Sequence, residues 1–464
     1  MKSEIYENKK SKFKILSKRL FILIVVSMFS IGFSQKKQSI SSLQSGPMVG
    51  YCEMKEAMIW LQTTKVASVK VEYFAIDNPK ELFLSDNYST SKEVGFTYHI
   101  ILDKLQQGKK YKYNVFIDNK KVVLSYETSF SSKKLWQWRG DAPDFTVAVG
   151  SCNYISEEAL DRPGKPYGSG YSVYETIASK NPDIMVWGGD NIYLREADWD
   201  SQTGINHRYT HSRSTKEMQP LLAKTQNFAI WDDHDFGPND GDRGFYHKNL
   251  TQKAFRNFWA NKTYGMDDDQ NEGVYSTFNW GDAQFFLLDN RYFKSPNDRK
   301  TGKREMLGED QLDWLVDNLV TSNAAFKIIV IGGQVLNTAE LYENYSNYTV
   351  EKSKLLKEIQ DNKIKGVMFI SGDRHFTELA MQTRENTYSL FDWTVSPLTS
   401  GVVSADKTTN EKNTNRVAGS MFNQNCFGNL VFSGNKENRQ MNLVLFDKDG
   451  KELWNKIILK KELE

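Results

Sequence analysis

The sequence has little net charge, few cysteines and no apolar run long enough to cross a membrane. Sixty Lys and Arg against 58 Asp and Glu leave a formal net charge of +2 over 464 residues, which is too little to indicate nucleic acid as the main partner. The main apolar stretch, Leu20 to Phe33, is shorter than the roughly 20 residues of a membrane span. We therefore expect neither nucleic-acid-specific binding nor a permanent membrane anchor, and the oligomeric state stays open.

Only three cysteines are present, Cys52, Cys152 and Cys426. Because the number is odd, at least one of them stays unpaired within a monomer. Cys152 belongs to a motif beside a candidate metal site, so we expect it to act as a thiolate ligand. Cys52 and Cys426 could form a disulfide or remain two buried thiols, and the sequence leaves both possibilities open.

The first 34 residues are organised like a secretory signal peptide. Basic residues are concentrated before the apolar stretch, and small residues, Gly32 and Ser34, end it. No cysteine lies near Ser34, so lipid attachment has no acceptor there. We therefore expect an exported protein that begins near Gln35 and acts in the periplasm, at the cell surface or in the medium.

The rest of the chain changes pattern once, around residues 136–144. Short alternating apolar segments over residues 42–135 predict a small fibronectin/Ig-like β-sandwich domain, and the segment 105–113 is typical of a tyrosine corner. From residue 144 to 464, apolar strands alternate with helix-like stretches, which predicts an α/β catalytic domain. We expect strands near 145–149, 184–187, 228–231, 284–288, 327–331 and 366–370, helices near 171–179, 252–259, 309–319 and 352–360, and three strands between 430 and 459. A Thr- and Asn-rich stretch, 403–416, is typical of a mobile surface loop.

Residues of metal-ligating type follow four of these predicted strands, at positions 150–153, 189–193, 231–235 and 371–375. Open α/β sheets gather ligands at the carboxyl ends of their strands. Asp190 could bridge two cations there, and Tyr193 could bind iron(III) as a phenolate. A helix N-cap and a packed aromatic side chain are the structural alternative for this pair.

Six polar groups crowd into nine residues after the third of these strands: Asp232, Asp233, His234, Asp235, Asn239 and Asp240. They would repel one another around an empty site, and cations would relieve that repulsion. A solvated acidic loop is the alternative, although the apolar run 228–231 indicates a buried approach. Carboxylate and amide oxygens suit hard divalent ions, so a mixed iron and calcium site fits better than two zinc ions.

His375 and Arg291 also end predicted strands. A lone histidine in such a place is usually structural, but Asp373 and Arg374 stand beside His375, which favours a ligand or acid–base role. Arg291 could clamp a substrate phosphate, because its planar fork matches paired oxygens. It could equally form a salt bridge with Asp289 or with another carboxylate of the site.

Taken in order, these motifs resemble those of the PhoD-like alkaline phosphatases and phosphodiesterases, a branch of the calcineurin-like metallophosphatases. The motifs are Gly150-Ser151-Cys152, Gly189-Asp190-Asn191-Ile192-Tyr193, Trp231-Asp232-Asp233-His234-Asp235 with Asn239, Leu288-Asp289-Asn290-Arg291, Gln334-Val335 and Ser371-Gly372-Asp373-Arg374-His375. The resemblance implies an α/β fold, a metallophosphatase two-sheet sandwich flanked by helices, behind the N-terminal β-sandwich.

The resemblance also implies a ligand set. Iron(III) would lie among Cys152, Asp190, Tyr193 and His375, and calcium would be held with the help of Asp190, Asp233 and Asn239. Asp232 is the alternative to Asp233, Asp373 completes the candidate metal ligands, and His234 and Arg291 are the candidate catalytic residues. Asp235 stands where the commonest family motif has Glu, which shortens one arm of the site.

The leading hypothesis is an exported, metal-dependent phosphoric ester hydrolase. It would be an alkaline phosphatase D-type phosphomonoesterase or phosphodiesterase that releases phosphate by in-line attack of a metal-activated water or hydroxide. A phosphodiesterase for lipid or wall-polymer substrates is possible on the same fold. The alternative from another class is a non-catalytic surface-binding protein on a metallophosphatase scaffold, and the complete ligand set argues against it.

Overall fold

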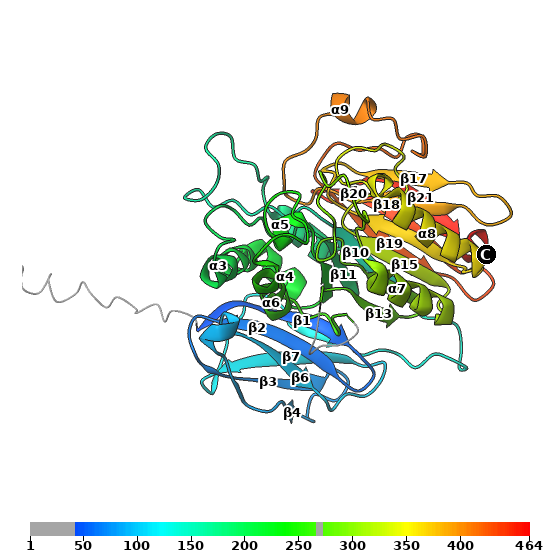
Figure 1. Cartoon of the computed structure of the whole chain (residues 1–464). Coiled ribbons are helices and arrows are strands. Elements are labelled where there is room, and N and C mark those ends of the chain that lie inside the picture. The colour runs from blue at the N-terminus through cyan, green and yellow to red at the C-terminus, as the bar shows by residue number, and fades with distance from the viewer. Residues whose placement is uncertain (1–41, 266–271) are drawn as a thin grey trace, which may run out of the picture. The chain divides into compact units, whose positions relative to one another are not determined.

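The computed structural model describes residues 42–265 and 272–464 (Figure 1), so the expected signal peptide, 1–34, lies outside the described residues. Ser42–Glu464 form one compact unit. Within the described ranges, no helix combines the length and the apolarity of a membrane span.

Two sheets organise this unit, and their strands from β10 onward form the expected catalytic half. The first has the strand order β21-β20-β19-β10-β11-β12-β1-β2-β6, and the second has the order β13-β14-β15-β16-β18-β17. The strands of the first are β1 (Leu43–Cys52), β2 (Ala57–Thr63), β6 (Thr97–Leu102), β10 (Phe145–Gly150), β11 (Ile184–Gly188), β12 (Gln226–Ile230), β19 (Cys426–Ser433), β20 (Gln440–Asp447) and β21 (Glu452–Leu459). Those of the second are β13 (Ser276–Trp280), β14 (Ala283–Leu287), β15 (Phe326–Ile331), β16 (Val367–Ser371), β17 (Glu378–Gln382) and β18 (Leu390–Thr394).

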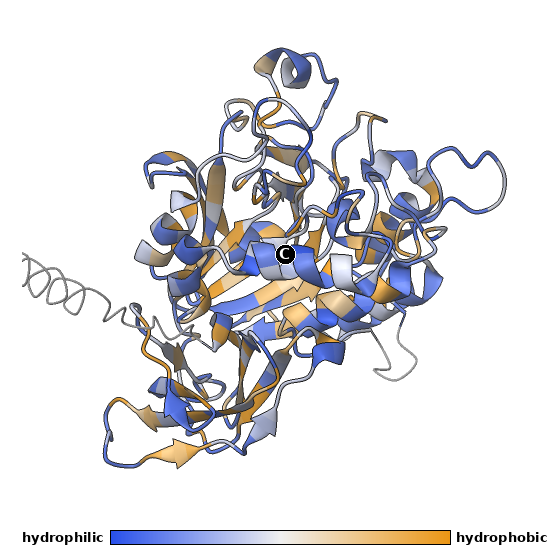
Figure 2. Cartoon of the chain, turned by 90° about the vertical axis from the view of Figure 1, so that its left-hand side faces the viewer, coloured by the Kyte–Doolittle hydropathy of each residue, from blue (hydrophilic) through white to orange (hydrophobic). Residues whose placement is uncertain are grey.

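Alternation along β10 explains how the layers pack. Val147 and Val149 belong to the core between the two sheets, whereas Ala148 belongs to a second core together with Val173 and Ile177 of a helix. Parallel strands covered on both faces are apolar throughout, and Figure 2 shows hydrophobic residues gathered along the inner strands while the helices carry hydrophilic outer faces. The main helices are α2 (Ser172–Ser179), α3 (Gln202–Arg213), α4 (Gln219–Leu222) and α6 (Lys248–Phe258) beside the first sheet, and α7 (Glu309–Thr321) and α8 (Thr349–Asp361) beside the second.

The N-terminal strands form the expected β-sandwich. A third, antiparallel sheet packs its apolar residues against those of β1, β2 and β6; its strands are β3 (Ser68–Ala75), β4 (Phe83–Leu84), β5 (Tyr88–Ser89), β7 (Lys110–Ile117), β8 (Lys120–Lys121) and β9 (Ser129–Ser131). The tyrosine corner is confirmed, because the Tyr111 hydroxyl accepts the Gln106 backbone N–H at 2.7 Å. One strand of the sandwich also pairs with the catalytic half, since β1 runs parallel to β12 at Val49 and Gln226.

The two-sheet architecture expected from the sequence is confirmed, but several elements escaped the pattern analysis. β1 contains Gly46, Pro47 and Gly50, which argue against a central strand. Helix α3 has no apolar face, because most of its buried side chains are polar, including Arg208 and Arg213. Neither sequence pattern resembles the element that it forms.

Candidate metal centre

The candidate site lies where the carboxyl ends of strands from both sheets meet. β10, β11 and β12 of the first sheet are followed by Cys152, Asp190 and Asp233, and β16 of the second sheet is followed by Asp373 and His375. Backbone hydrogen bonds join neighbouring loops: the Cys152 N–H donates to Gly189 O at 3.1 Å, and the Gly372 N–H donates to Gly332 O at 2.7 Å. The parallel pairing therefore brings these motifs to one edge.

The backbone of these loops is strained. Four non-glycine residues have a positive φ in the left-handed region: Cys152 (59°), Asp190 (52°), Asp373 (64°) and His375 (54°). Such conformations cost free energy and concentrate at functional sites. Gly189, with φ +93°, permits the close approach of two loops, because a Cβ there would lie 2.9 Å from Cβ of Asp232.

Cys152, Asp190, Tyr193 and His375 converge on one point. The Tyr193 hydroxyl lies 3.2 Å from Asp190 Oδ2 and 3.2 Å from His375 Nε2. Sγ of Cys152 lies 3.6 Å from the same Asp190 oxygen. Ligand atoms of Cys152, Asp190 and His375 all fall within 4.8 Å of one another, so this part of the candidate set forms a compact group of sulfur, oxygen and nitrogen donors.

Asp233 connects three further groups whose ligand atoms lie within 4.8 Å of one another. The first includes Asp190 and His234, the second Asp232 and Asp373, and the third Asp240 and Glu343. Asp232 Oδ2 and Asp233 Oδ1 are buried and have no hydrogen-bond partner among residues 42–265 and 272–464. Buried carboxylate oxygens without a partner are costly, and this donor set fits metal ions that would pair with them.

The pKa values of these buried side chains reflect the same electrostatic repulsion. Burial, reinforced by the charges of neighbouring aspartates, raises the pKa of Asp190 and of Asp373 well above the ordinary range. Burial also raises the pKa of Asp232 to about 6 and lowers that of His375 to about 4. Burial and the nearby Asp190 charge raise the pKa values of the Cys152 thiol and of the Tyr193 phenol. Bound cations would supply the charge that stabilises the deprotonated forms.

Arg291 is fully buried and is engaged by carboxylates. Its Nε pairs with Asp232, its Nη1 pairs with Glu343, and its Nη2 lies 3.9 Å from Asp233 Oδ1. Asp289 instead accepts backbone N–H groups, among them that of Arg291 at 2.8 Å. This geometry favours the ion-pair alternative, because a phosphate clamp would need an accessible guanidinium.

Asp235 faces away from the metal-ligating groups. Its carboxylate accepts the backbone N–H of Asn191 at 3.1 Å and that of Asp232 at 3.0 Å. It therefore ties the loop of Asp190 to the loop of Asp232. Asp235, whose side chain is shorter than the Glu of the commonest family motif, thus connects two loops.

His234 and Asn239 lie on the wall of a cavity of about 520 Å³ that opens onto the metal-ligating groups. The His234 ring packs on Tyr193 at 4.2 Å between centroids, and its Nδ1 has no hydrogen-bond partner among the described residues. Asn239 is exposed at the mouth of the cavity. All ten candidate residues thus lie in or beside one site, although Arg291 supports it from behind.

The sequence analysis missed several residues that contact the site. The Tyr167 hydroxyl lies 3.0 Å from His375 Nδ1, and the Ser396 hydroxyl donates to Cys152 Sγ at 3.1 Å. Glu343 joins the acidic groups from the loop before α8. Tyr167 and Glu343 have no apolar strand directly before them, so the signal that found the other candidate ligands does not mark them. Ser396 does follow a buried strand, β18, but that strand was not among those predicted.

The stretch 403–416 lies largely at the surface, as expected, but it is partly ordered against the site. It contains α9 (Ala405–Thr409), and Glu411 is buried in an ion pair with Arg374 at 2.7 Å. Gln334 also accepts a hydrogen bond from Arg374 at 2.6 Å, which explains the Gln334-Val335 motif as a support for this arginine. Lys407 and Glu411 line the cavity.

The cysteines are all buried and free. Cys52 and Cys426 are therefore two separate buried thiols, the second of the two possibilities that the sequence left open. Cys152 is the one that reaches the metal-ligating groups.

Comparisons with known proteins agree with this geometry. A family model described as PhoD-like phosphatase matches residues 147–443, and a domain of unknown function, DUF7800, matches residues 40–135. Alkaline phosphatase D of Bacillus subtilis (strain 168) is 22% identical over 364 residues, which cover 67% of this chain and 59% of that protein. The chain thus matches less than two thirds of the length of this curated relative.

Two solved structures show the same fold. A structure of PhoD superposes with a TM-score of 0.73 at 15% identity, covering 90% of this chain and 93% of the other. The purple acid phosphatase PPD1 from yellow lupin (Lupinus luteus) seeds gives a TM-score of 0.63 at 12% identity, covering 89% of this chain and 74% of the other. At these identities the two superpositions show the shared fold alone.

In the protein without metal, the free energy of unfolding should fall as the pH rises from 6.5 to 8.5. The folded-state pKa values of Asp190, Asp235 and Asp373 are raised, that of Asp235 to about 7, so the metal-free folded chain binds more protons than the unfolded chain. Stability is then present at low pH and lost as the pH rises, by about 1.4 kcal/mol per pH unit for each proton retained.

Denaturant unfolding of the chelated protein at several pH values would measure this loss. His234 and His375, whose pKa values are lowered, oppose it only at lower pH, where the unfolded histidines gain protons. Protein with metal restored is the control and should lose much less. A chelated protein that gains stability over this range would contradict the electrostatic account.

Proposed function

The chain belongs to the PhoD-like phosphatase family, and we propose that it is an exported, metal-dependent phosphoric ester hydrolase that cleaves phosphate mono- or diesters. The observation that carries the proposal is the convergence of Cys152, Asp190, Tyr193 and His375 beside the buried, unpartnered oxygens of Asp232 and Asp233. A structural cluster would have satisfied these oxygens with hydrogen bonds.

We assign iron(III) to Cys152, Asp190, Tyr193 and His375, because thiolate and phenolate donors suit a trivalent ion. Calcium is assigned to the oxygen-rich side, where Asp232, Asp233, Asn239 and Asp373 supply hard donors and Asp240 and Glu343 extend the set. Bound there, the cations would polarise the oxygens of a phosphate ester and lower the pKa of a water molecule.

The chain's own residues position the ester and manage its proton. His234 lines the cavity, and burial lowers its pKa, so its ring is neutral at neutral pH and can donate a hydrogen bond to the leaving oxygen. Arg291 holds Asp232 from behind and keeps the carboxylate pointed at the site. Because the metal-ligating residues are buried, water reaches them only from the open side of the cavity.

Export is proposed from residues 1–34 alone, whose signal-peptide pattern would deliver the enzyme to the periplasm, the cell surface or the medium. Hydrolysis outside the cytoplasm would then release inorganic phosphate from esters that do not cross the membrane.

Elemental analysis of the mature protein, purified without added metal, tests the proposal directly. We expect iron together with calcium, and hydrolysis of 4-nitrophenyl phosphate or bis(4-nitrophenyl) phosphate that is lost on chelation and restored by metal. A folded protein with neither metal nor activity would instead favour the non-catalytic binding protein on the same scaffold.

Tyr193→Phe should remove a visible charge-transfer band and lower turnover while the fold is kept, because the phenolate would be an iron(III) ligand. Absorption spectroscopy of the purified variant measures the band. Tyr113→Phe is the matched control, since Tyr113 is equally buried but lies in the β-sandwich. An unchanged spectrum in Tyr193→Phe would rule out the iron–tyrosinate assignment.

His234→Asn should lower kcat/KM about 100-fold for an alkyl phosphate but less than about tenfold for 4-nitrophenyl phosphate, because nitrophenolate leaves without a proton donor. Steady-state kinetics on both esters measure the difference. His207→Asn is the control, since His207 pairs with Glu157 and lines neither cavity beside the site. Equal losses on the two esters would show that His234 acts through metal binding or structure.

A further inference from the structure

A second cavity, of about 230 Å³, adjoins the metal centre. It shares Tyr167, His234 and Asn239 with the larger cavity. The rest of its wall is formed by three basic residues, two tyrosines, two prolines and one acid: Arg162, Lys165, Arg195, Tyr154, Tyr193, Pro163, Pro166 and Asp161. The hydrolytic mechanism above uses none of the three basic residues.

Arg195 is the unusual member of this wall. It is only 7% exposed, and its guanidinium carbon lies 4.9 Å from the ring centre of Tyr154 and 5.4 Å from that of Tyr193. Its Nε is buried without a hydrogen-bond partner among the described residues. Within residues 42–265 and 272–464, no carboxylate oxygen lies within ion-pair distance, 4.0 Å, of its guanidinium nitrogens.

The acids next to Arg195 in sequence, and the acid that shares its cavity, are engaged elsewhere. Asp198 pairs with Arg208 at 2.8 Å, Glu196 pairs with Arg162 at 3.3 Å, and Asp161 accepts the Tyr154 hydroxyl at 2.6 Å. Arg195 thus has no carboxylate partner: a side-chain hydrogen bond links it to the Tyr154 hydroxyl, and its guanidinium faces the rings of Tyr154 and Tyr193.

Other buried arginines of the described chain do have partners. Arg208, Arg291, Arg374 and Arg439 each pair with a carboxylate, and Arg213 donates to the Phe258 carbonyl at 3.1 Å. Arg195 thus lacks the carboxylate partner that four of these five arginines have. Because a buried charge without a counter-charge is costly, its position on a cavity wall points to an external anion.

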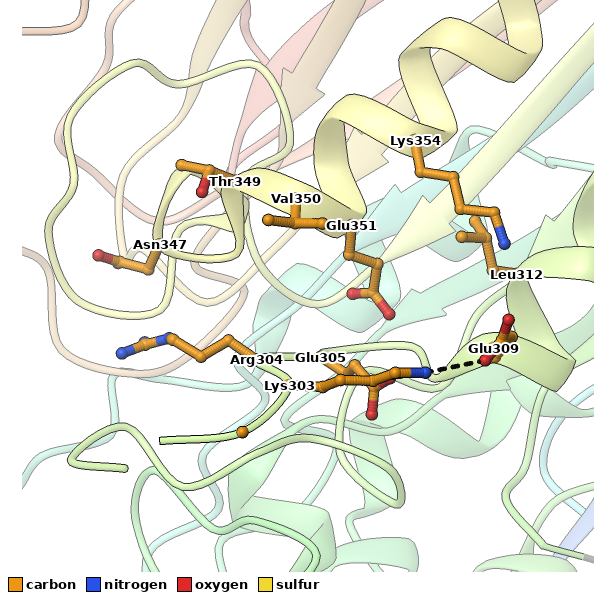
Figure 3. Close-up of a pocket in the computed structure, with 11 residues that line it drawn as sticks. Lys303, Arg304, Glu305, Glu309, Leu312, Asn347, Thr349, Val350, Glu351 and Lys354 are labelled. Atoms are coloured by element: carbon orange, nitrogen blue, oxygen red, sulfur yellow. Dashed lines mark hydrogen bonds and ion pairs between the residues drawn. The ribbon is translucent and has the colours of Figure 1, made fainter. Parts of the chain in front are cut away.

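The cavity between the starts of α7 and α8 provides a contrast (Figure 3). It is larger, about 460 Å³, and it also contains cations. Lys303 pairs with Glu309 at 3.0 Å, Lys354 pairs with Asp313 at 3.1 Å, and Arg304 donates to the Asn297 carbonyl at 3.2 Å. Both lysines are paired with carboxylates of the chain, so they give no comparable indication of an anion.

We propose that Arg195, with Lys165 and Arg162 at the rim, binds a second anionic group of the substrate while the scissile phosphate lies at the metal centre. The proposal rests on the proposed function and narrows it to phosphoesters that carry a further phosphate or carboxylate. A guanidinium matches either group through paired hydrogen bonds. The rings of Tyr154 and Tyr193 hold the guanidinium in place for this contact.

The test compares three phosphate monoesters of one short alkyl alcohol, whose other end carries a phosphate, a carboxylate or a neutral carboxamide. We expect the wild type to prefer an anionic end over the carboxamide by at least about tenfold in kcat/KM, and Arg195→Met to reduce this preference to less than about threefold. Arg195→Lys should retain part of it. The first two esters separate a phosphate-binding from a carboxylate-binding subsite.

Arg384→Met is the matched control. Arg384 also stacks on a tyrosine, Tyr388, at 4.7 Å, but it precedes β18, at the opposite end of that strand from the metal centre. The preference of Arg384→Met for an anionic end over the carboxamide should equal that of the wild type. A wild-type preference near one, or a preference that survives in Arg195→Met, would overturn the proposal.

A binding measurement separates the subsite from catalysis. Methylenebisphosphonate, which is not hydrolysed, should raise the Tm of the wild type more than methylphosphonate does, and Arg195→Met should lose this difference. If the wild type hydrolyses none of the esters but keeps the difference, the proposed function fails and the anion subsite stands. Removing a buried charge that has no counter-charge should leave the Tm of the ligand-free protein unchanged or raise it. A lower Tm for ligand-free Arg195→Met would therefore show that Arg195 has a structural role and would overturn the proposal.

Discussion

Mutual repulsion among buried carboxylates is the constraint on which the rest of this structure depends. Asp190, Asp232, Asp233 and Asp373 are brought to one edge by two different sheets, and burial denies them the screening of water. Arg291 places its buried guanidinium against Asp232 and shares it with Glu343, and Arg374 stands beside Asp373. The architecture around the site holds like charges together, and the cations that the family implies complete the balance.

That constraint explains features that look unrelated. The strained backbone at these site residues is tolerated because a buried strand fixes the start of each loop. The Asp235 carboxylate accepts hydrogen bonds from two backbone N–H groups and so sets the distance between the Asp190 and Asp232 loops. Ser396 and Tyr167 fix Cys152 and His375 in the same way.

Sequence patterns predicted most of the fold and the ligand set for one physical reason. A ligand that directly follows an apolar strand, such as Cys152 or Asp190, is marked by the strand itself. Glu343 and Tyr167 reach the site from long loops, and nothing local marks them. Arg291 was found but its role stayed open, because only the folded chain shows that its guanidinium is enclosed by carboxylates. Helix α3 escaped for a similar reason, since its buried face is polar.

The pairing of β1 with β12 also dictates an order of assembly. β1 is among the first segments of the described chain to be synthesised, but its partner Gln226 follows only after the sandwich and the strands β10 and β11. Until then, β12 has an open edge, and β12 is the strand that delivers Asp232 and Asp233. Contacts so distant in sequence form late in folding. The edge that carries the candidate metal ligands is therefore completed only after both halves of the chain have met, so any metal bound there would report complete folding.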